Sequence, residues 1–355
     1  MKKYALFVII SFVCIMGLIG GTVYIVDPYF HYHAPFKGIY YKLGNYVYQN
    51  DGISKNFDYD AIITGTSMTK DFSTKDIDEM WGVNSVRLTF LGEGYRRIND
   101  NLVTAFNHNK DIKLVIRGVD PIWFVSDESF LEYGSYEEYP TYLYDDNILN
   151  DTKYLFNFGI IKNDVFPRIK DSIKHLPYGE SKPKDLNYRG GKELVLEAYE
   201  RPEKSNKAVT EEETKQLFDT LDKNLEMNVL KVIRDHPDTK FILFFPPYEI
   251  PIWDSINQEG KDVLQRRIDM ERYAIEKCLE LDNVEFYSFN DCFDITSDMN
   301  YYVDDLHYVP YVSHYMLECM SSGDEHRLTK DNYLEYIDRI REYYTTYDYD
   351  SFFEE

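Results

Sequence analysis

A serine, a histidine and an aspartate stand along this chain in an order that suits nucleophilic catalysis. Ser67 follows a short apolar stretch in "AIITGTSMTKDF", and His307 lies near the C-terminal end in "YYVDDLHYVPY". A serine hydroxyl needs a base to take its proton, and a histidine oriented by a carboxylate is the usual base. Asp304 precedes His307 by three residues, so one tight turn can bring its carboxylate to a ring nitrogen. Asp305 is the alternative if the register differs.

Attack on an acyl carbonyl forms an oxyanion, which needs N–H donors. We expect the backbone N–H groups of Ser67 and of Gly92, in "LTFLGEGY", to supply them. Asp120 follows a third apolar stretch, but an ionised Asp accepts hydrogen bonds and cannot donate one. It is therefore a candidate for orienting a loop or contacting substrate. Arg117 could reach an anionic group, unless the alternation of its strand turns it away.

Each of these residues also has a purely structural interpretation. Ser67 could cap a helix N-terminus, because serine is a preferred capping residue. His307 could be a half-buried histidine among tyrosines, and Asp304 and Asp305 could cap the helix that follows. These interpretations are the better ones when each residue is taken alone. The joint occurrence, in this order, favours a Ser67–His307–Asp304 triad.

Five apolar stretches with strand character position these residues, and helical stretches such as 260–280 alternate with them. Such alternation predicts a mostly parallel sheet with helices on both faces. Active sites of open parallel sheets lie beyond the carboxyl ends of the strands, where Ser67, Gly92 and Asp120 are found. The predicted strands are 59–63, 85–90, 113–120, 240–247 and 284–289.

This pattern resembles the SGNH (GDSL-like) hydrolase superfamily over roughly residues 55–320. "GTSMT" stands where that family has its serine block, "LTFLGEGY" resembles its glycine block, and "DDLH" matches its Asp-x-x-His. The third block departs, because Asp120 stands where the family has Asn. The resemblance implies a flavodoxin-like three-layer α/β/α sandwich around a mostly parallel five-stranded sheet, working without a cofactor or a metal. The plan is also similar to membrane-anchored bacterial cell-envelope members, including D-alanyl-lipoteichoic-acid esterase relatives.

An apolar run without charged residues, 4–26, follows Lys2 and Lys3. It is long enough to cross the hydrocarbon core of a bilayer as a helix. The two lysines should stay in the cytoplasm, which places the rest of the chain outside. A cleaved signal peptide is the alternative, but its apolar region is usually shorter. We therefore expect a single-pass plasma-membrane protein with an extracellular catalytic domain.

The domain boundaries that follow from these features are coarse. We expect a cytoplasmic stub and anchor, a juxtamembrane segment, an α/β domain with a large Tyr-rich insertion, and an acidic tail. Thr210 and Glu213 form a capping box that starts the helix returning from the insertion, and Thr329 is expected to cap the last helix. The cytoplasmic stub and anchor are expected at 1–27 and the juxtamembrane segment at 28–54. The α/β domain is expected at 55–345, with its insertion at about 122–225, and the acidic tail at 346–355.

Composition narrows the range of partners. The formal net charge is -23, so the surface repels phosphate backbones and we expect no nucleic-acid partner. His31 and His33 form an H-x-H pair without a visible third ligand, so no metal is predicted there. Outside the anchor, Cys278, Cys292 and Cys319 fit either one disulfide and a free thiol or three free thiols, and their spacing is not a metal pattern.

Two functions from different classes fit these features. The first is a membrane-anchored serine esterase or O-acyltransferase that acts on acyl esters of an envelope polymer or extracellular glycan. The second is a catalytically inactive protein of the same fold, which binds glycan or scaffolds a membrane O-acyltransferase partner. The identity of the acyl group and of the glycan does not follow from the sequence.

Overall fold

The computed structural model describes residues 2–44, 46–131, 140–145, 147–174, 179–180, 187–323 and 325–354. Its contacts divide the chain into two units. The first contains residues 1–58, 104–109 and 133–183, and the second contains 59–103, 110–132 and 184–355. The predicted insertion at 122–225 is thus divided between the two units. Its residues 132–139, 146, 175–178 and 181–186 lie outside the described part of the chain.

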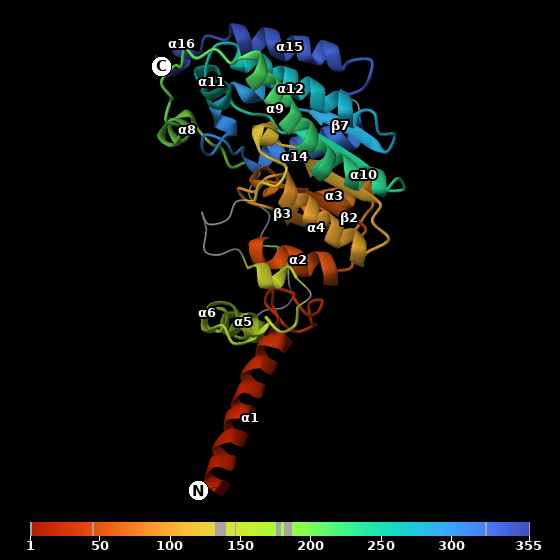
Figure 1. The fold of residues 1–355 in the computed structure, drawn as a ribbon, viewed down its shortest axis with the longest axis vertical. Helices are drawn as coiled ribbons and strands as arrows, with labels where there is room; N and C mark the ends of the chain where they lie inside the picture. The colour runs from red at the N-terminus through yellow and green to blue at the C-terminus, as the bar shows by residue number, and fades with distance from the viewer. Residues whose placement is uncertain are drawn as a thin grey trace. The chain divides into compact units, whose positions relative to one another are not determined.

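The first unit begins with α1 (Lys2–Val26), the long helix that leads to the N-terminus in Figure 1. Among the described residues, α1 is the one helix long and apolar enough to cross a membrane, judged by length and composition. The other elements of this unit are short. They are β1 (Lys42–Leu43), α2 (Tyr46–Asn56), η3 (Thr141–Leu143), α5 (Thr152–Leu155), α6 (Phe158–Ile160), the π-helical turn η4 (Ile161–Val165), α7 (Phe166–Lys174) and β5 (Gly179–Glu180).

A buried carboxylate organises the chain where α1 ends. Asp27 is wholly buried, with a left-handed φ of 39°. It accepts backbone N–H groups from His31, Tyr32 and His33 at 3.0, 2.8 and 3.1 Å. The hydroxyl of Tyr154 donates to the same carboxylate at 2.8 Å. These donors compensate the carboxylate for its lost hydration, so the segment after α1 folds back as a compact turn.

The second unit is built on a six-stranded sheet. Its strand order is β3-β2-β4-β6-β7-β8, and the first five strands are parallel. These five correspond to the predicted strands and have the order of a flavodoxin-like sheet. The strands are β2 (Ala61–Gly65), β3 (Ser85–Thr89), β4 (Leu114–Gly118), β6 (Lys240–Phe245), β7 (Val284–Ser288) and β8 (Arg327–Leu328).

The predicted sheet of five strands is therefore one strand too small. The additional strand, β8, pairs antiparallel with β7 through Leu328 and Arg327. Two residues are too few to show the alternation that marks a strand in a sequence, which is why the prediction missed it.

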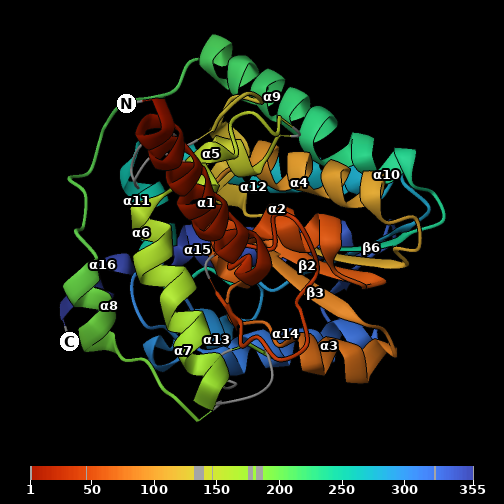
Figure 2. The same cartoon turned by 90° about the horizontal axis from the view of Figure 1, so that it is seen from below.

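Helices cover both faces of this sheet. Figure 2 shows α4 and α12 on one side of the strands and α3 and α14 on the other. β2 and β4 are buried along their whole length, as expected for central strands covered on both faces. The helical elements are η1 (Ser67–Thr69), α3 (Thr74–Trp81), α4 (Tyr95–His108), η2 (Pro121–Val125), α8 (Lys192–Ala198), α9 (Glu211–Leu225), η5 (Glu226–Leu230), α10 (Lys231–Asp235), α11 (Ile250–Gln258), α12 (Val263–Cys278), α13 (Phe293–Thr296), η6 (Met299–Tyr301), α14 (Pro310–Ser322), α15 (Tyr333–Thr346) and α16 (Tyr349–Glu354).

The predicted helix ends have mixed outcomes. The capping box of Thr210 and Glu213 is present at the start of α9. Thr329 does not cap the last long helix, because α15 begins after Asn332. The Thr329 hydroxyl instead accepts the N–H of Asp331 within the preceding turn. Part of the predicted acidic tail is helical as α16.

The central strand β6 gives a test of the core. Phe244 is fully buried, and its ring lies 5.4 Å from that of Phe72 and 6.4 Å from that of Phe289. We expect Phe244→Ala to lower the free energy of unfolding by about 3–5 kcal/mol, through lost burial and a cavity. Urea denaturation of the detergent-solubilised chain, followed by circular dichroism, measures this. Leu334→Ala, at a half-exposed position, is the control, and equal losses in the two variants would contradict the assignment.

Candidate active site

The turn after β2 is shaped by a glycine and a threonine. A Cβ at Gly65 would lie 2.6 Å from Cγ2 of Thr69, so only glycine lets the chain turn this tightly. The chain then enters η1, where the hydroxyl of Thr66 accepts the N–H of Met68 at 3.2 Å. Thr66 thus takes the capping role that was the structural alternative for Ser67. Ser67 itself stands partly exposed at the start of the turn.

Ser67, His307 and Asp304 lie together beyond the carboxyl end of β2. The Oγ of Ser67 is 2.7 Å from Nε2 of His307. The other ring nitrogen, Nδ1, is 2.9 Å from both carboxylate oxygens of Asp304. The structure thus brings together three residues that are up to 240 positions apart in the sequence. It also chooses between the neighbouring carboxylates, because Asp304 and not Asp305 bonds to the ring.

The environment of Asp304 fixes which nitrogen of His307 carries the proton. One carboxylate oxygen of Asp304 accepts the backbone N–H groups of Leu306 and His307, at 3.0 and 2.6 Å. Burial alone would raise the pKa of Asp304, but the hydrogen bonds from His307 and Leu306 lower it to about 2. An ionised carboxylate can only accept, so Nδ1 of His307 must donate. Nε2 is then the acceptor and faces the hydroxyl of Ser67.

The predicted oxyanion donors follow two neighbouring strands. Gly65 pairs with Thr89 across β2 and β3, and the N–H of Phe90 donates to the carbonyl of Gly65 at 2.9 Å. The segments that carry Ser67 and Gly92 therefore begin side by side, at the carboxyl ends of β2 and β3. Gly92 has a left-handed φ of 71°. In the described part of the chain, the backbone N–H groups of Ser67 and Gly92 have no hydrogen-bond acceptor within the protein. Both N–H groups can therefore donate to a bound acceptor.

Asp120 is buried next to the turn that carries Ser67. One of its carboxylate oxygens accepts a short hydrogen bond from the hydroxyl of Thr66, and the other accepts that of Tyr248 at 3.2 Å. Burial raises the pKa of Asp120 to about 6, although these two hydroxyls and the nearby His307 act in the opposite direction. Since Thr66 also holds the N–H of Met68, Asp120 orients the turn that carries Ser67.

Arg117 occupies a different environment from the one predicted. Its side chain is fully buried, and the guanidinium carbon lies 6.0 Å from the centroid of the Tyr95 ring. One guanidinium nitrogen donates to the carbonyl of Tyr95 at 3.5 Å. Burial lowers the pKa of Arg117 to about 10. A fully buried guanidinium has no surface to offer a solute, so we do not include Arg117 in the proposed site.

Three contributing residues were not identified from the sequence. Thr66 and Tyr248 hold Asp120, and the hydroxyl of Tyr308 donates a short hydrogen bond to the carbonyl of Met68. Tyr248 follows β6 closely, so its place at a strand end was a usable signal. Tyr308 is adjacent to His307, but nothing in the sequence indicates that it reaches across to the turn after β2.

Three further histidines, His31, His33 and His314, have protein partners. His31 is 3.3 Å from Asp151, and His33 lies within 2.9 Å of the carbonyl oxygens of Ala34 and Tyr24. His314 is 2.9 Å from Asp76. These contacts give the three side chains structural roles.

Comparison with known proteins does not identify a family for this chain. No family model matches the chain, and no curated protein matches it. A solved structure from Streptococcus pneumonia, named "a putative platelet activating factor", is similar at 13% identity, covering 79% of this chain and 90% of that one. Its TM-score is 0.38, which is too low to support an inference about activity. The fold assignment therefore depends on the strand order itself.

The buried carboxyl of Asp120 gives a second test. Its pKa of about 6 is above the ordinary value of 3.8, so the folded state binds the proton more tightly than the unfolded chain. This contribution favours folding at low pH and is lost as the pH rises through about 6. We expect infrared spectra to show a protonated carboxyl that titrates with a midpoint near pH 6.

The spectrum of Asp120→Asn identifies this signal by difference. In Tyr248→Phe the midpoint should move upward, because a hydroxyl that stabilises the carboxylate is lost. A midpoint near pH 4 in the unmodified chain would contradict the burial of Asp120.

Proposed function

We propose that this protein is a membrane-anchored serine esterase or O-acyltransferase acting on acyl esters of cell-envelope or extracellular glycans. The observation that carries the proposal is the 2.7 Å separation between Ser67 Oγ and His307 Nε2, with Asp304 at 2.9 Å from the other nitrogen. Nucleophile, base and orienting group thus stand within hydrogen-bond reach of one another, which is the geometric test for this chemistry.

The chemistry would proceed in two steps. Ser67 Oγ attacks the ester carbonyl while Nε2 of His307 takes the hydroxyl proton, and the N–H groups of Ser67 and Gly92 stabilise the oxyanion. The same proton then passes from His307 to the departing alcohol, leaving an acyl-serine. Water or a sugar hydroxyl attacks this ester in turn, which gives hydrolysis or transfer. Asp304 and the buried charge of Asp120 favour the imidazolium that forms transiently.

The aromatic surroundings of the catalytic loop support a glycan as substrate. Tyr301 and Tyr311 flank the Asp304–His307 segment, and their rings stack with centroids 5.9 Å apart. The guanidinium of Arg189 lies over both rings, at 5.7 and 5.2 Å from the centroids. Half-buried tyrosine rings with a polar edge suit sugar faces, which present C–H groups between hydroxyls.

Labelling with a fluorophosphonate probe tests the proposal. We expect one adduct on Ser67 in the full-length, detergent-solubilised chain, located by peptide mapping. Ser67→Ala should abolish it, and His307→Ala should slow it strongly because the hydroxyl loses its base. Asp304→Asn should slow labelling on the order of 10⁴-fold, since the amide favours the wrong tautomer.

His314→Gln is the matched control for these variants. His314 also has an Asp oxygen 2.9 Å from Nδ1, but its other nitrogen faces Glu318 at 3.5 Å and not a serine. Labelling should therefore persist in this variant. A folded wild-type chain that takes up no probe would favour the alternative function, a glycan-binding protein or a scaffold for a membrane O-acyltransferase.

The proposed location is also testable. Lys2 and Lys3 at the start of α1 favour a cytoplasmic N-terminus, which would put the second unit on the outer side of the plasma membrane. Alkaline phosphatase, which needs an oxidising compartment, should be active when fused after residue 355. Activity only of a cytoplasmic reporter at that position would contradict the orientation.

A further inference from the structure

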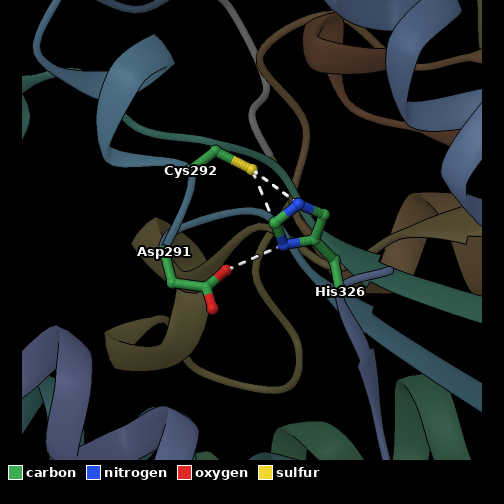
Figure 3. Close-up of side chains that lie close together, drawn as sticks. All are labelled: Asp291, Cys292 and His326. Atoms are coloured by element: carbon green, nitrogen blue, oxygen red, sulfur yellow. Dashed lines mark hydrogen bonds and ion pairs between the residues drawn. The ribbon is translucent and has the colours of Figure 1, made fainter. Parts of the chain in front are cut away.

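A cluster of metal-binding side chain types lies at the sheet edge formed by β7 and β8. Figure 3 shows Asp291 and Cys292, from the segment after β7, pointing toward His326, which precedes β8. Sγ of Cys292 is 3.4 Å from Nε2 of His326, and an oxygen of Asp291 is 3.0 Å from its Nδ1. Cys292 is almost fully buried, and His326 is mostly so.

A second pair of side chains meets the same imidazole. Cys319, on α14, and Glu325 place their ligand atoms within 4.8 Å of each other and of the His326 ring. Sγ of Cys319 is 3.9 Å from a carboxylate oxygen of Glu325. The two thiols thus belong to two groups of possible ligands that share His326, one with Asp291 and Cys292 and the other with Cys319 and Glu325.

Two of the distances between these donor atoms are close to those in a tetrahedral zinc site. Zinc lies about 2.3 Å from sulfur and about 2.0–2.2 Å from nitrogen or oxygen, so tetrahedral angles separate such donors by about 3.6 Å. The pair Cys292–His326 stands at 3.4 Å and the pair Cys319–Glu325 at 3.9 Å. The four donors do not form a single group within 4.8 Å, so Cys292 and the pair Cys319–Glu325 would have to move toward each other to enclose one ion.

The surroundings of His326 orient its ring in the way that zinc sites require. A histidine that ligates a metal usually donates its other N–H to a carboxylate, which fixes the tautomer. Asp291 accepts from Nδ1, and its second oxygen is held by Arg339 at 2.7 Å. Nε2 is then the nitrogen left to bind a metal, and Sγ of Cys292 lies 3.4 Å from it and 3.7 Å from Nδ1. His326 also has a left-handed φ of 58°, a costly backbone conformation for a residue other than glycine.

We infer that Cys292, Cys319, His326 and Glu325 form a structural Zn²⁺ site, with Asp291 as the carboxylate that orients the imidazole. On binding, each of the two thiols loses its proton, so two protons are released for each ion bound. The hydroxyl of Tyr315, now 3.1 Å from Nε2, must turn away to make room for the ion. The site would fix α14 to the end of the sheet, and α14 begins just after His307.

Metal analysis of the full-length, detergent-solubilised and reduced chain tests this inference. After chelation and re-equilibration with Zn²⁺, we expect one ion per chain and a raised unfolding temperature. With Co²⁺ we expect a thiolate-to-cobalt charge-transfer band and the visible bands of a tetrahedral complex. Both should disappear in Cys292→Ala and Cys319→Ala, and Glu325→Gln, at an exposed position, should weaken binding without loss of folding.

Two control variants make the result specific. Cys278→Ala removes a buried thiol of α12 outside the cluster and should bind zinc as the wild type does. Tyr315→Phe removes the hydroxyl that competes for Nε2 and should bind at least as tightly. The inference is overturned if the folded wild type with titratable thiols binds no stoichiometric zinc. It is equally overturned if binding survives loss of both cysteines, or if Cys292 and Cys319 are found as a disulfide and bind no zinc after reduction.

Discussion

The parallel pairing of β2 with β3 and β4 is the constraint on which the rest of the second unit depends. Parallel strands end at the same edge, so whatever follows them in sequence is delivered to one place in space. Gly65 is opposite Thr89 on β3, and Gly118 directly follows Arg117, the last residue of β4 that pairs with β2. The turn with Ser67, the loop with Gly92 and the segment with Asp120 therefore share one edge. A shift of one residue in any strand would turn these groups to the other face.

Asp120 is a buried carboxyl group just after the carboxyl end of β4. A buried carboxylate is unfavourable unless donors surround it, and here the hydroxyls of Thr66 and Tyr248 fill that role. The same bonds connect the turn that carries Ser67 to the segment after β6. An asparagine in this position would replace one acceptor oxygen with a donor, so the Thr66 hydroxyl would have to reorient. The carboxylate of Asp120 thus stabilises the turn that carries Ser67. Its negative charge also interacts favourably with a positive charge on His307.

The two candidate sites of the second unit use opposite ends of one helix. The loop that carries Asp304 and His307 leads directly into α14, and Cys319 lies near the end of that helix. His307 is held from one side by Asp304 and faces Ser67 on the other. If zinc binds at Cys319 and His326, metal–ligand bonds would fix one end of α14, and the hydrogen bonds of His307 to Asp304 and Ser67 would hold the segment before its other end. The arrangement of Ser67, His307 and Asp304 would then depend on metal content through one helix.

The sequence by itself determined the local features. Apolar stretches predicted the five parallel strands, and the uncharged run that ends at Val26 predicted a helix long enough to span a membrane. The positions of Ser67, Gly92 and Asp120 after predicted strands made them candidate site residues. Tertiary structure alone decided the contacts between distant segments. It selected Asp304 over Asp305, placed Arg117 in the core, added the two-residue strand β8 and gathered Cys292, Cys319 and His326. The periodicity of apolar residues indicates which side of a segment is buried. Which side chains contact one another depends on strand register and on how the segments pack.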